Sequence, residues 1–317
     1  MPELILDPYS SLGEADDGEV VAFGVRWDGL PYIVTASTPL DYRTPDSDGA
    51  SFPKIRPDGP QNYRVYRGDP GIASLVTTIE KEEFNVHQVQ PMDEDRLLLV
   101  SARCGYGKEG ADENGRLYDR SGRFLGGISL GDGIQDVAVT TDGLIWTSYF
   151  DEGVFGGLGR RDPLGGSGLV ARKEDGAVAY AYEPPEGLGG ISDCYAMNAD
   201  GNDVWVYYYT DFPLVLIRNG SIEAHWQIPV KGADAFAVSG NFALFRGGYD
   251  NPDNCHLIEL AQPEAKVRLR FRLRDRHGEA IEAERTAGRG NALFLLRGRE
   301  VFKVTVTDAM SLLGKRS

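Results

Sequence analysis

The chain has 317 residues, of which 41% are hydrophobic and 26% are charged, and its formal net charge is −15. This composition is typical of a globular protein with enough chain to bury a sizeable core. A strongly negative surface repels phosphate groups, so we expect neither nucleic acid nor an anionic membrane as a partner.

The amino-terminal segment has no basic stretch followed by an apolar one, and so does not resemble a secretory signal. No apolar run approaches the ~18 residues of a membrane-spanning helix. The three cysteines (Cys104, Cys194 and Cys255) are far apart and form no CxxC pair, which argues against a disulfide framework or a zinc knuckle. We therefore expect a cytoplasmic protein, and we expect it to be a monomer.

The first predicted strand is ELILD, residues 3–7, which has no partner of its own nearby in the sequence. A short strand, a WDG turn and an apolar strand then follow at 20–37. Stronger copies of this strand–turn–strand pattern recur about every fifty residues. They span 84–104, 132–156, 191–211, 232–250 and 281–300.

Two more candidate strands follow each pair, for example GRLYDR and RFLGGISL after the second copy. Evenly spaced groups of four strands with polar turns are typical of propeller blades. The six copies predict an all-β, six-bladed β-propeller with four antiparallel strands per blade, forming a single domain over residues 1–317. Too little chain follows the last copy for a fourth strand, so we expect residues 3–7 to supply it and close the ring.

Large rings recur near the middle of the second strand of a blade, at Trp146, Trp205, Phe245 and Phe294. We interpret them as packing between blades rather than as stacking on a cofactor. Asn219-Gly220, which matches the start of a glycosylation sequon, is interpreted as a plain turn. The tail that begins at Asp308 is the one segment with a helical pattern.

Residues 267–276 alternate between apolar side chains and arginines. This pattern predicts an outermost blade strand whose arginines protect its edge. The alternative is a docking stripe for an acidic partner.

One position of the first strand carries polar side chains in successive copies. Aligning the copies gives Ala22, His87, Asp136, Asp193, Asp234 and Glu284, with Glu282 as an alternative in the last copy. Because the first strand of a blade lines the central channel, we expect these residues to surround the channel at one rim. Four converging carboxylates repel one another, so either some stay protonated with raised pKa values or a cation lies among them.

A cation held by Asp136, Asp193, Asp234 and Glu284 fits calcium, and a contribution from His87 also suits manganese, iron or zinc. The alternative is a hydrated channel without metal, in which one or two aspartates cap backbone amides.

Long loops are expected on the same face of the ring, at 38–62, 102–113 and 149–168. Loops on a rigid scaffold often carry binding residues, and aromatic groups mixed with a few charges suit a polar small molecule. The predicted substrate-binding residues are Arg103, Tyr149, Asp151, Glu152, Tyr209, Asp211, Arg246 and Tyr249.

Several catalytic motifs are missing: the sequence has no GxSxG, no GxxxxGK[ST] and no HExxH. At the level of architecture and channel carboxylates, the chain resembles the calcium-dependent lactonase, arylesterase and gluconolactonase group and the strictosidine-synthase-like propellers. The segment 132–156 also resembles uncharacterised actinobacterial proteins. The first resemblance implies a channel cation with substrate placed over it. His87 and the lack of the expected asparagines depart from that pattern.

Two functions follow as hypotheses. In the first, the protein is an enzyme that hydrolyses or rearranges an ester-like or lactone-like small molecule, with His87, Asp136 or Asp193 as general base beside a channel cation. In the second, the same face binds a ligand, peptide or partner protein without chemistry. The fold cannot decide between them, because propellers perform both functions.

Overall fold

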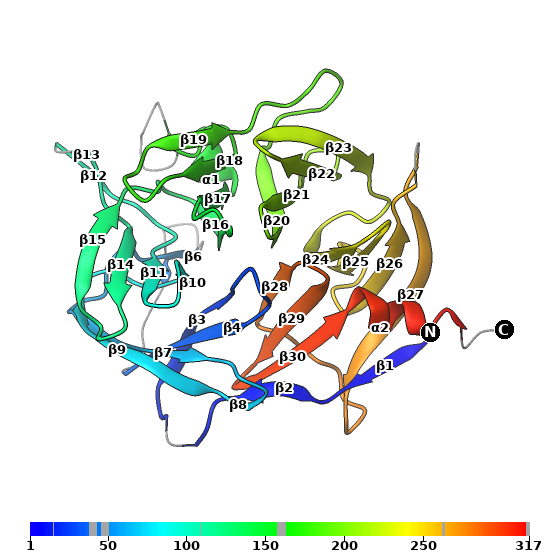
Figure 1. The fold of residues 1–317 in the computed structure, drawn as a ribbon, viewed down its shortest axis with the longest axis horizontal. Helices are drawn as coiled ribbons and strands as arrows, with labels where there is room; N and C mark the ends of the chain where they lie inside the picture. The colour runs from blue at the N-terminus through cyan, green and yellow to red at the C-terminus, as the bar shows by residue number, and fades with distance from the viewer. Residues whose placement is uncertain are drawn as a thin grey trace.

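Six antiparallel sheets stand around a central axis as the blades of a propeller (Figure 1). The computed structural model describes residues 1–14, 16–37, 43–45, 51–108, 110–156, 163–261 and 264–314, with 43–45 and 51–53 described by their backbone alone. In five blades the first four strands follow chain order from the axis outward, whereas the sixth blade takes its fourth strand from the amino terminus; two blades carry a fifth strand. The predicted six-bladed, all-β fold is confirmed.

The first three blades use consecutive stretches of the chain. Blade one contains β3 (Glu19–Val25), β4 (Pro31–Ala36), β7 (Gln61–Arg67) and β9 (Ser74–Glu82). Blade two contains β10 (Gln88–Pro91), β11 (Arg96–Val100), β14 (Gly115–Asp119) and β15 (Phe124–Ile128). Blade three contains β16 (Ile134–Val139), β17 (Ile145–Tyr149), β18 (Leu169–Arg172) and β19 (Val178–Ala181).

The last three blades follow the same plan, and the amino terminus completes them. Blade four contains β20 (Asp193–Asp200), β21 (Asp203–Tyr209), β22 (Pro213–Arg218) and β23 (Ser221–Gln227). Blade five contains β24 (Ala233–Ser239), β25 (Phe242–Gly247), β26 (Asn254–Glu259), β27 (Lys266–Asp275) and β1 (Glu3–Leu6). Blade six contains β28 (Arg285–Arg289), β29 (Ala292–Arg297), β30 (Glu300–Thr305), β2 (Pro8–Ser11) and β8 (Gly71–Ile72).

Short elements decorate the ring. Two small hairpins are β5 (Arg43–Pro45) with β6 (Ser51–Pro53), and β12 (Tyr106–Gly107) with β13 (Gly110–Ala111). Helix α1 (Asp151–Phe155) follows β17, and α2 (Val306–Ser311) begins two residues before the predicted helical tail and overlaps it. Thr305 and Asp308 form a reciprocal capping box that fixes the start of α2. Neither helix within the described ranges has the length and apolar character needed to cross a membrane.

The amino terminus closes the ring, as predicted, but a different segment forms the closing strand. Strand β2 pairs antiparallel with β30 and is the fourth strand of blade six. The segment predicted for that place, residues 3–7, instead forms β1, which lies parallel to β27 as a fifth strand of blade five. The outer edge of β27 is therefore covered, and Arg274 Nε donates to Glu3 Oε1 across this pair at 2.9 Å.

Hydrophobic packing joins each blade to its neighbour. The buried apolar residues form six clusters, and each cluster combines side chains from two adjacent blades. Trp146 packs between blades three and four, Trp205 and Phe245 between four and five, and Phe294 between six and one. The packing interpretation of these rings is confirmed, and burial of aromatic surface is what makes neighbouring blades adhere.

The inner strands approach one another so closely that two positions require glycine. A Cβ at Gly24 of β3 would lie 2.0 Å from the carbonyl oxygen of Val89 in blade two. A Cβ at Gly288 of β28 would lie 1.8 Å from the carbonyl oxygen of Phe236 in blade five. Real Cβ atoms essentially never come this near to backbone, so these glycines allow the axis to be narrow.

The hairpin between β22 and β23 has the predicted turn. Asn219 and Gly220 have φ values of 51° and 69°, as a two-residue turn of the I′ type requires. Asparagine tolerates the left-handed region better than other non-glycine residues, which is why this pair works here.

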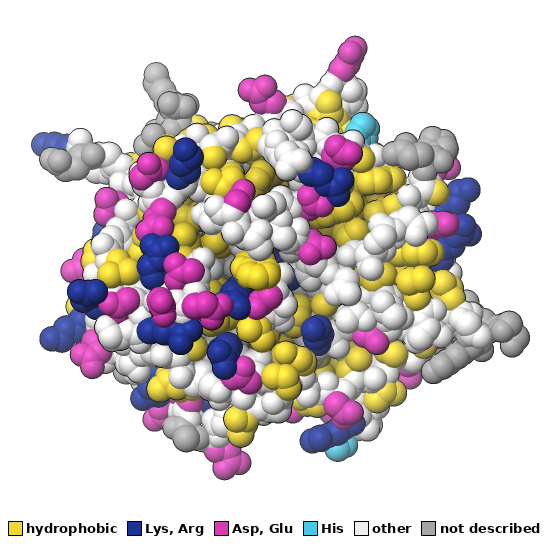
Figure 2. All heavy atoms as spheres, in the orientation of Figure 1, with side chains coloured by type: hydrophobic (Ala, Val, Ile, Leu, Met, Phe, Trp, Pro, Cys, Tyr) yellow, Lys and Arg dark blue, Asp and Glu magenta, His cyan; other side chains and the backbone are white. Residues whose placement is uncertain are grey.

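Charged side chains are mixed rather than segregated on the surface. Figure 2 shows acidic and basic groups next to one another over the blades on the left of the view. Ion pairs join the hairpins of neighbouring blades, as with Arg26 and Glu94 at 2.7 Å and Arg96 and Glu174 at 2.5 Å. The Arg96–Glu174 pair is partly exposed and is worth up to about 1 kcal/mol, whereas the Arg26 side chain is largely buried.

Candidate functional site

A cavity of about 490 Å³ opens at one end of the central channel, and all six blades line it. We call it the upper cavity, and we call the end of the ring where it lies the top face. The first and second strands of a blade are antiparallel, so Asp193 at the start of β20 lies opposite Tyr209 at the end of β21. The described parts of the loops between second and third strands consequently lie on the top face, as expected. Residues 38–42, 46–50, 109 and 157–162 of the predicted loops lie outside the described residues.

The structure brings the four predicted channel carboxylates together in the lining of the upper cavity. They are Asp136, Asp193, Asp234 and Glu284. Gln88, Gln135, Tyr195, Arg285 and Thr286 add further polar groups to the lining.

The six aligned positions are, however, not structurally equivalent. A β-bulge inserts one extra residue into the inner strand of four blades, at Val21, Gln135, Tyr195 and Asp234. The aligned residues Ala22 and Asp136 therefore lie one residue after the bulge, and Asp193 lies two residues before it. Because a bulge disturbs the alternation of side chains, neighbouring residues such as Gln135 and Asp136 both reach the cavity.

His87 lies behind the cavity wall, and its neighbour Gln88 contributes to the lining instead. His87 Nδ1 accepts a hydrogen bond from the Ala102 amide at 3.1 Å. Burial, reinforced by the charges of Arg285 and Arg103, lowers the pKa of His87 to about 3. The ring is therefore neutral near pH 7 and screened from a ligand in the upper cavity.

Arginines accompany two of the four carboxylates. Arg246, which is itself buried, forms an ion pair with Asp234. Both terminal nitrogens of Arg289 approach the Asp136 carboxylate at 3.4 Å. Glu284 Oε1 accepts a hydrogen bond from the Gly298 amide at 3.2 Å. We expected these acids to repel one another, and the guanidinium groups of Arg246 and Arg289 reduce that repulsion.

Arg289 also closes the channel beneath the upper cavity. Its side chain is 1% exposed and donates to backbone carbonyl oxygens of blades one, three, four and six. The acceptors are Val25 at 2.9 Å, Val137 at 2.9 Å, Met197 at 3.4 Å and Gly288 at 2.7 Å. This role of Arg289 was not predicted, although an arginine at the end of an inner strand, followed by Gly290, was a signal.

A second cavity of about 720 Å³ lies on the other side of Arg289, among the turns between first and second strands. Trp27, Asp200, Arg218 and Lys303 are among its lining residues. Arg289 thus lies between the upper cavity and the second cavity.

Asp193 differs from the other three acids of the upper cavity. Its side chain has no hydrogen-bond or ion-pair partner within the residues that the structure describes. Partial burial, together with the charge of Asp151, raises the pKa of the Asp193 carboxyl. Among the described carboxylates of this lining, Asp193 is the one without a hydrogen-bond or ion-pair partner.

One aromatic ring lines the cavity near Asp193, and further rings pack around it. Tyr195 lies in the lining, and its hydroxyl is 2.6 Å from the hydroxyl of Tyr249. Phe212 lies among these rings, with centroids 5.2 Å from Tyr195, 5.7 Å from Tyr209 and 5.7 Å from Tyr249. We call Tyr195, Tyr209, Phe212 and Tyr249 the aromatic rim. Tyr209 and Tyr249, both predicted to bind substrate, are 43% and 61% exposed.

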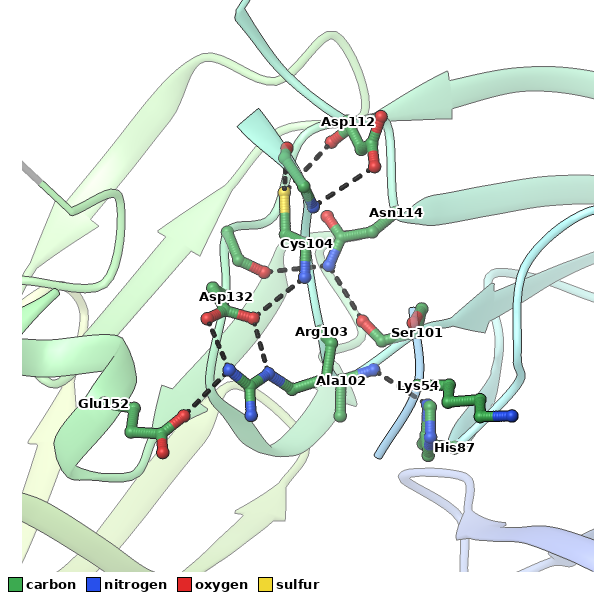
Figure 3. Close-up of polar contacts among 12 residues, drawn as sticks. Lys54, His87, Ser101, Ala102, Arg103, Cys104, Asp112, Asn114, Asp132 and Glu152 are labelled. Carbon is green, nitrogen blue, oxygen red and sulfur yellow. Dashed lines mark hydrogen bonds and ion pairs between the residues drawn. The ribbon is translucent and has the colours of Figure 1, made fainter. Parts of the chain in front are cut away.

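Arg103 and Glu152, also predicted to contact substrate, belong to a polar network under the top-face loops (Figure 3). Arg103 Nε donates to Asp132 Oδ1 at 2.8 Å, and a terminal nitrogen lies 2.8 Å from Glu152 Oε2. The Cys104 amide also donates to Asp132 Oδ1, at 2.9 Å. The network therefore ties the loop after β11 to the segment before β16 and to α1. The role of Asp132 was not predicted, although its position between Gly131 and Gly133 indicated a tight backbone turn.

Tyr149 and Asp211 occupy different environments. Tyr149 has no exposed surface, and its hydroxyl donates to the Leu130 carbonyl oxygen. Its place is therefore in the core between blades two and three. Asp211 is exposed in the turn after β21, where its carbonyl oxygen accepts from Gln227. Asp151 is exposed at the start of α1.

The carboxylates of the upper cavity fit a divalent cation poorly. Calcium requires several oxygen ligands on one centre, but Asp136 and Asp234 already face arginines. Within the described ranges, no three His, Cys, Asp or Glu side chains converge as metal ligands would. We therefore derive no chemistry through a metal, and calcium binding stays a prediction.

Comparisons with known proteins support the fold. A model of the YxzG family matches residues 171–304, which is less than half of the chain. No curated protein matches the chain. A chain in the crystal structure of the mitotic checkpoint complex is 10% identical with a TM-score of 0.50, over 96% of this chain and 92% of that one.

Two further solved structures are similar over most of this chain. The WD40 domain of Neurospora crassa Pan2 is 11% identical, with a TM-score of 0.47 over 92% of this chain and 78% of that one. The extracellular domain of a putative one-component system from B. thetaiotaomicron is 12% identical, with a TM-score of 0.45 over 96% of this chain and 42% of that one. At such identities these likenesses concern fold alone, and the resemblance to the lactonase group stays a prediction. What the chain shares with solved structures is the β-propeller architecture.

Proposed function

We propose that the protein binds a small polar molecule in the upper cavity, with Asp193 as the main charged contact. The observation that carries the proposal is the unpartnered Asp193 carboxylate in the wall of a cavity whose other acids have partners. A volume of about 490 Å³ lies within the range that small-molecule sites occupy. The walls belong to inner strands, and rigid elements hold contacting groups precisely.

A thermal-shift screen tests this proposal with small amines, carboxylic acids, sugars and neutral alcohols as probes. A ligand that binds the folded state raises the melting temperature by mass action. We expect at least one class to stabilise the wild-type protein and to stabilise Asp193→Asn much less. A matched control is Asp7→Asn, which removes one charge from an exposed position between β1 and β2. No stabilisation by any class would overturn the proposal.

A second candidate is a hydrolase acting on small esters or lactones. The raised pKa of Asp193 favours it, because a general base works best when its pKa approaches the working pH. Asp136 is the other predicted catalytic acid at this cavity, but it faces Arg289. Hydrolysis of p-nitrophenyl acetate and γ-butyrolactone, measured for wild type, Asp193→Asn and Asp136→Asn, tests this function. Rates equal to the buffer blank, or unchanged in Asp193→Asn, would reject Asp193 as the base.

A further inference from the structure

We propose that the ligand of the upper cavity is an organic cation, an ammonium group held between Asp193 and the aromatic rim. This inference rests on the proposed function, since it assigns a chemical class to the ligand of the same cavity.

The charge balance of the cavity favours a cation. Four carboxylates line it, whereas Arg285 is the one cationic side chain among the lining residues that the structure describes. Arg246 and Arg289 stand behind the wall and face Asp234 and Asp136. Even when all three guanidinium groups are counted against the four carboxylates, one negative charge remains. Asp151, whose charge acts on Asp193, adds another.

The aromatic rim supplies a surface suited to an ammonium group. The face of an aromatic ring is negative, and cations bind to it within about 6 Å of the centroid. Elsewhere in the described structure, rings carry the protein's own cations, such as Arg116 over Phe124 at 4.0 Å and Arg26 over Trp27 at 5.5 Å. Within the described residues, no arginine or lysine lies over a ring of the aromatic rim.

Local backbone features hold the rim in place. Phe212 has a φ of 57°, a backbone conformation that is unusual for a bulky residue and costs free energy. Its side chain is buried, with 2% of its surface exposed. The ring of Tyr249 lies against Gly232, where a Cβ would be 2.4 Å from Tyr249 Cδ1. Gly232 itself lines the cavity. The strained turn and the glycine together place the rings beside Asp193.

Calorimetric titration with choline tests the proposal, and its neutral isostere 3,3-dimethylbutan-1-ol serves as the matched probe. A second pair, n-butylammonium and butan-1-ol, covers primary amines. We expect at least one cation to bind about tenfold or more tightly than its neutral partner. We also expect Asp193→Asn to weaken that binding roughly tenfold to a hundredfold, as loss of a charged hydrogen-bond acceptor does. Tyr249→Leu should weaken it less, and Asp7→Asn should leave it unchanged.

Equal binding of a cation and its neutral partner, or binding that Asp193→Asn leaves intact, would overturn the organic cation. If no cation binds but an acid, a sugar or an alcohol from the screen does, the cation is also rejected and the proposed function stands. If no probe of any class binds, both fall.

Discussion

Replacing Arg289 tests whether one guanidinium group holds the inner strands together at the axis. In Arg289→Ala, carbonyl oxygens of four blades lose their shared donor, and Asp136 loses its cationic partner. Removing one partner of a buried ion pair costs about 3–5 kcal/mol. We expect a loss of about 4 kcal/mol, a large share of the 5–15 kcal/mol that is typical of folded proteins. For a chain of this size the melting temperature should fall by roughly 6 °C.

Urea unfolding and thermal melts followed by circular dichroism measure this effect. Arg218→Ala is the control, because Arg218 pairs with Asp203 at 2.7 Å but its side chain is 44% exposed. The control should lose no more than about 1 kcal/mol. Arg289→Met retains much of the volume without the charge, and should remain less stable than wild type. If Arg289→Ala is as stable as Arg218→Ala, then the guanidinium group does not brace the axis and our account of the channel is wrong.

Three further predictions concern close packing, protonation and metal. Gly288→Ala should lower the free energy of unfolding in urea by at least about 2 kcal/mol, because the added Cβ would meet a carbonyl oxygen. Gly126 has open space around it, so Gly126→Ala should stay within about 0.5 kcal/mol of wild type. Equal losses in the two variants would contradict the close approach at Gly288. Burial, with a contribution from Arg270, lowers the pKa of His256 to about 4, so its stabilisation is present above pH 6.5 and is lost as the pH falls toward 4. Between pH 6.5 and 5 the wild type should lose up to about 2 kcal/mol relative to His256→Gln, and parallel pH profiles would refute this. Chelator should change the melting temperature by less than about 1 °C, and a fall of several degrees that calcium reverses would show that the predicted ion binds.

The sequence was sufficient to predict the repeated architecture. Each blade has an apolar second strand that must be buried, and turns such as Asn219-Gly220 separate the strands. These signals are local, so they can be recognised in the sequence without knowledge of the whole fold. The convergence of Asp136, Asp193, Asp234 and Glu284 followed from the blade geometry alone.

What the sequence could not predict depends on register and on distant partners. A bulge adds one residue to a strand and leaves no mark in the composition. The alignment therefore paired Asp193 of blade four with Asp234 of blade five, whereas the structural equivalent of Asp234 in blade four is Tyr195. The partners of Arg289 come from blades that are up to 264 residues away in the chain. The exchange of roles between residues 3–7 and β2 has the same cause, because both segments are short and extended and only the completed ring distinguishes their partners.

The way the amino terminus is joined into the ring has a mechanical consequence. Met1 and α2 lie on the same side of the molecule (Figure 1), and β1 and β2 are held to blades five and six by edge pairing. A force that pulls on the amino terminus would load the pairing of β1 with β27 before that of β2 with β30, because β1 precedes β2 in the chain. The inner strands that wall the upper cavity lie farthest from the pulling points within each blade. Under tension the protein should therefore open at its seam while the cavity is still intact.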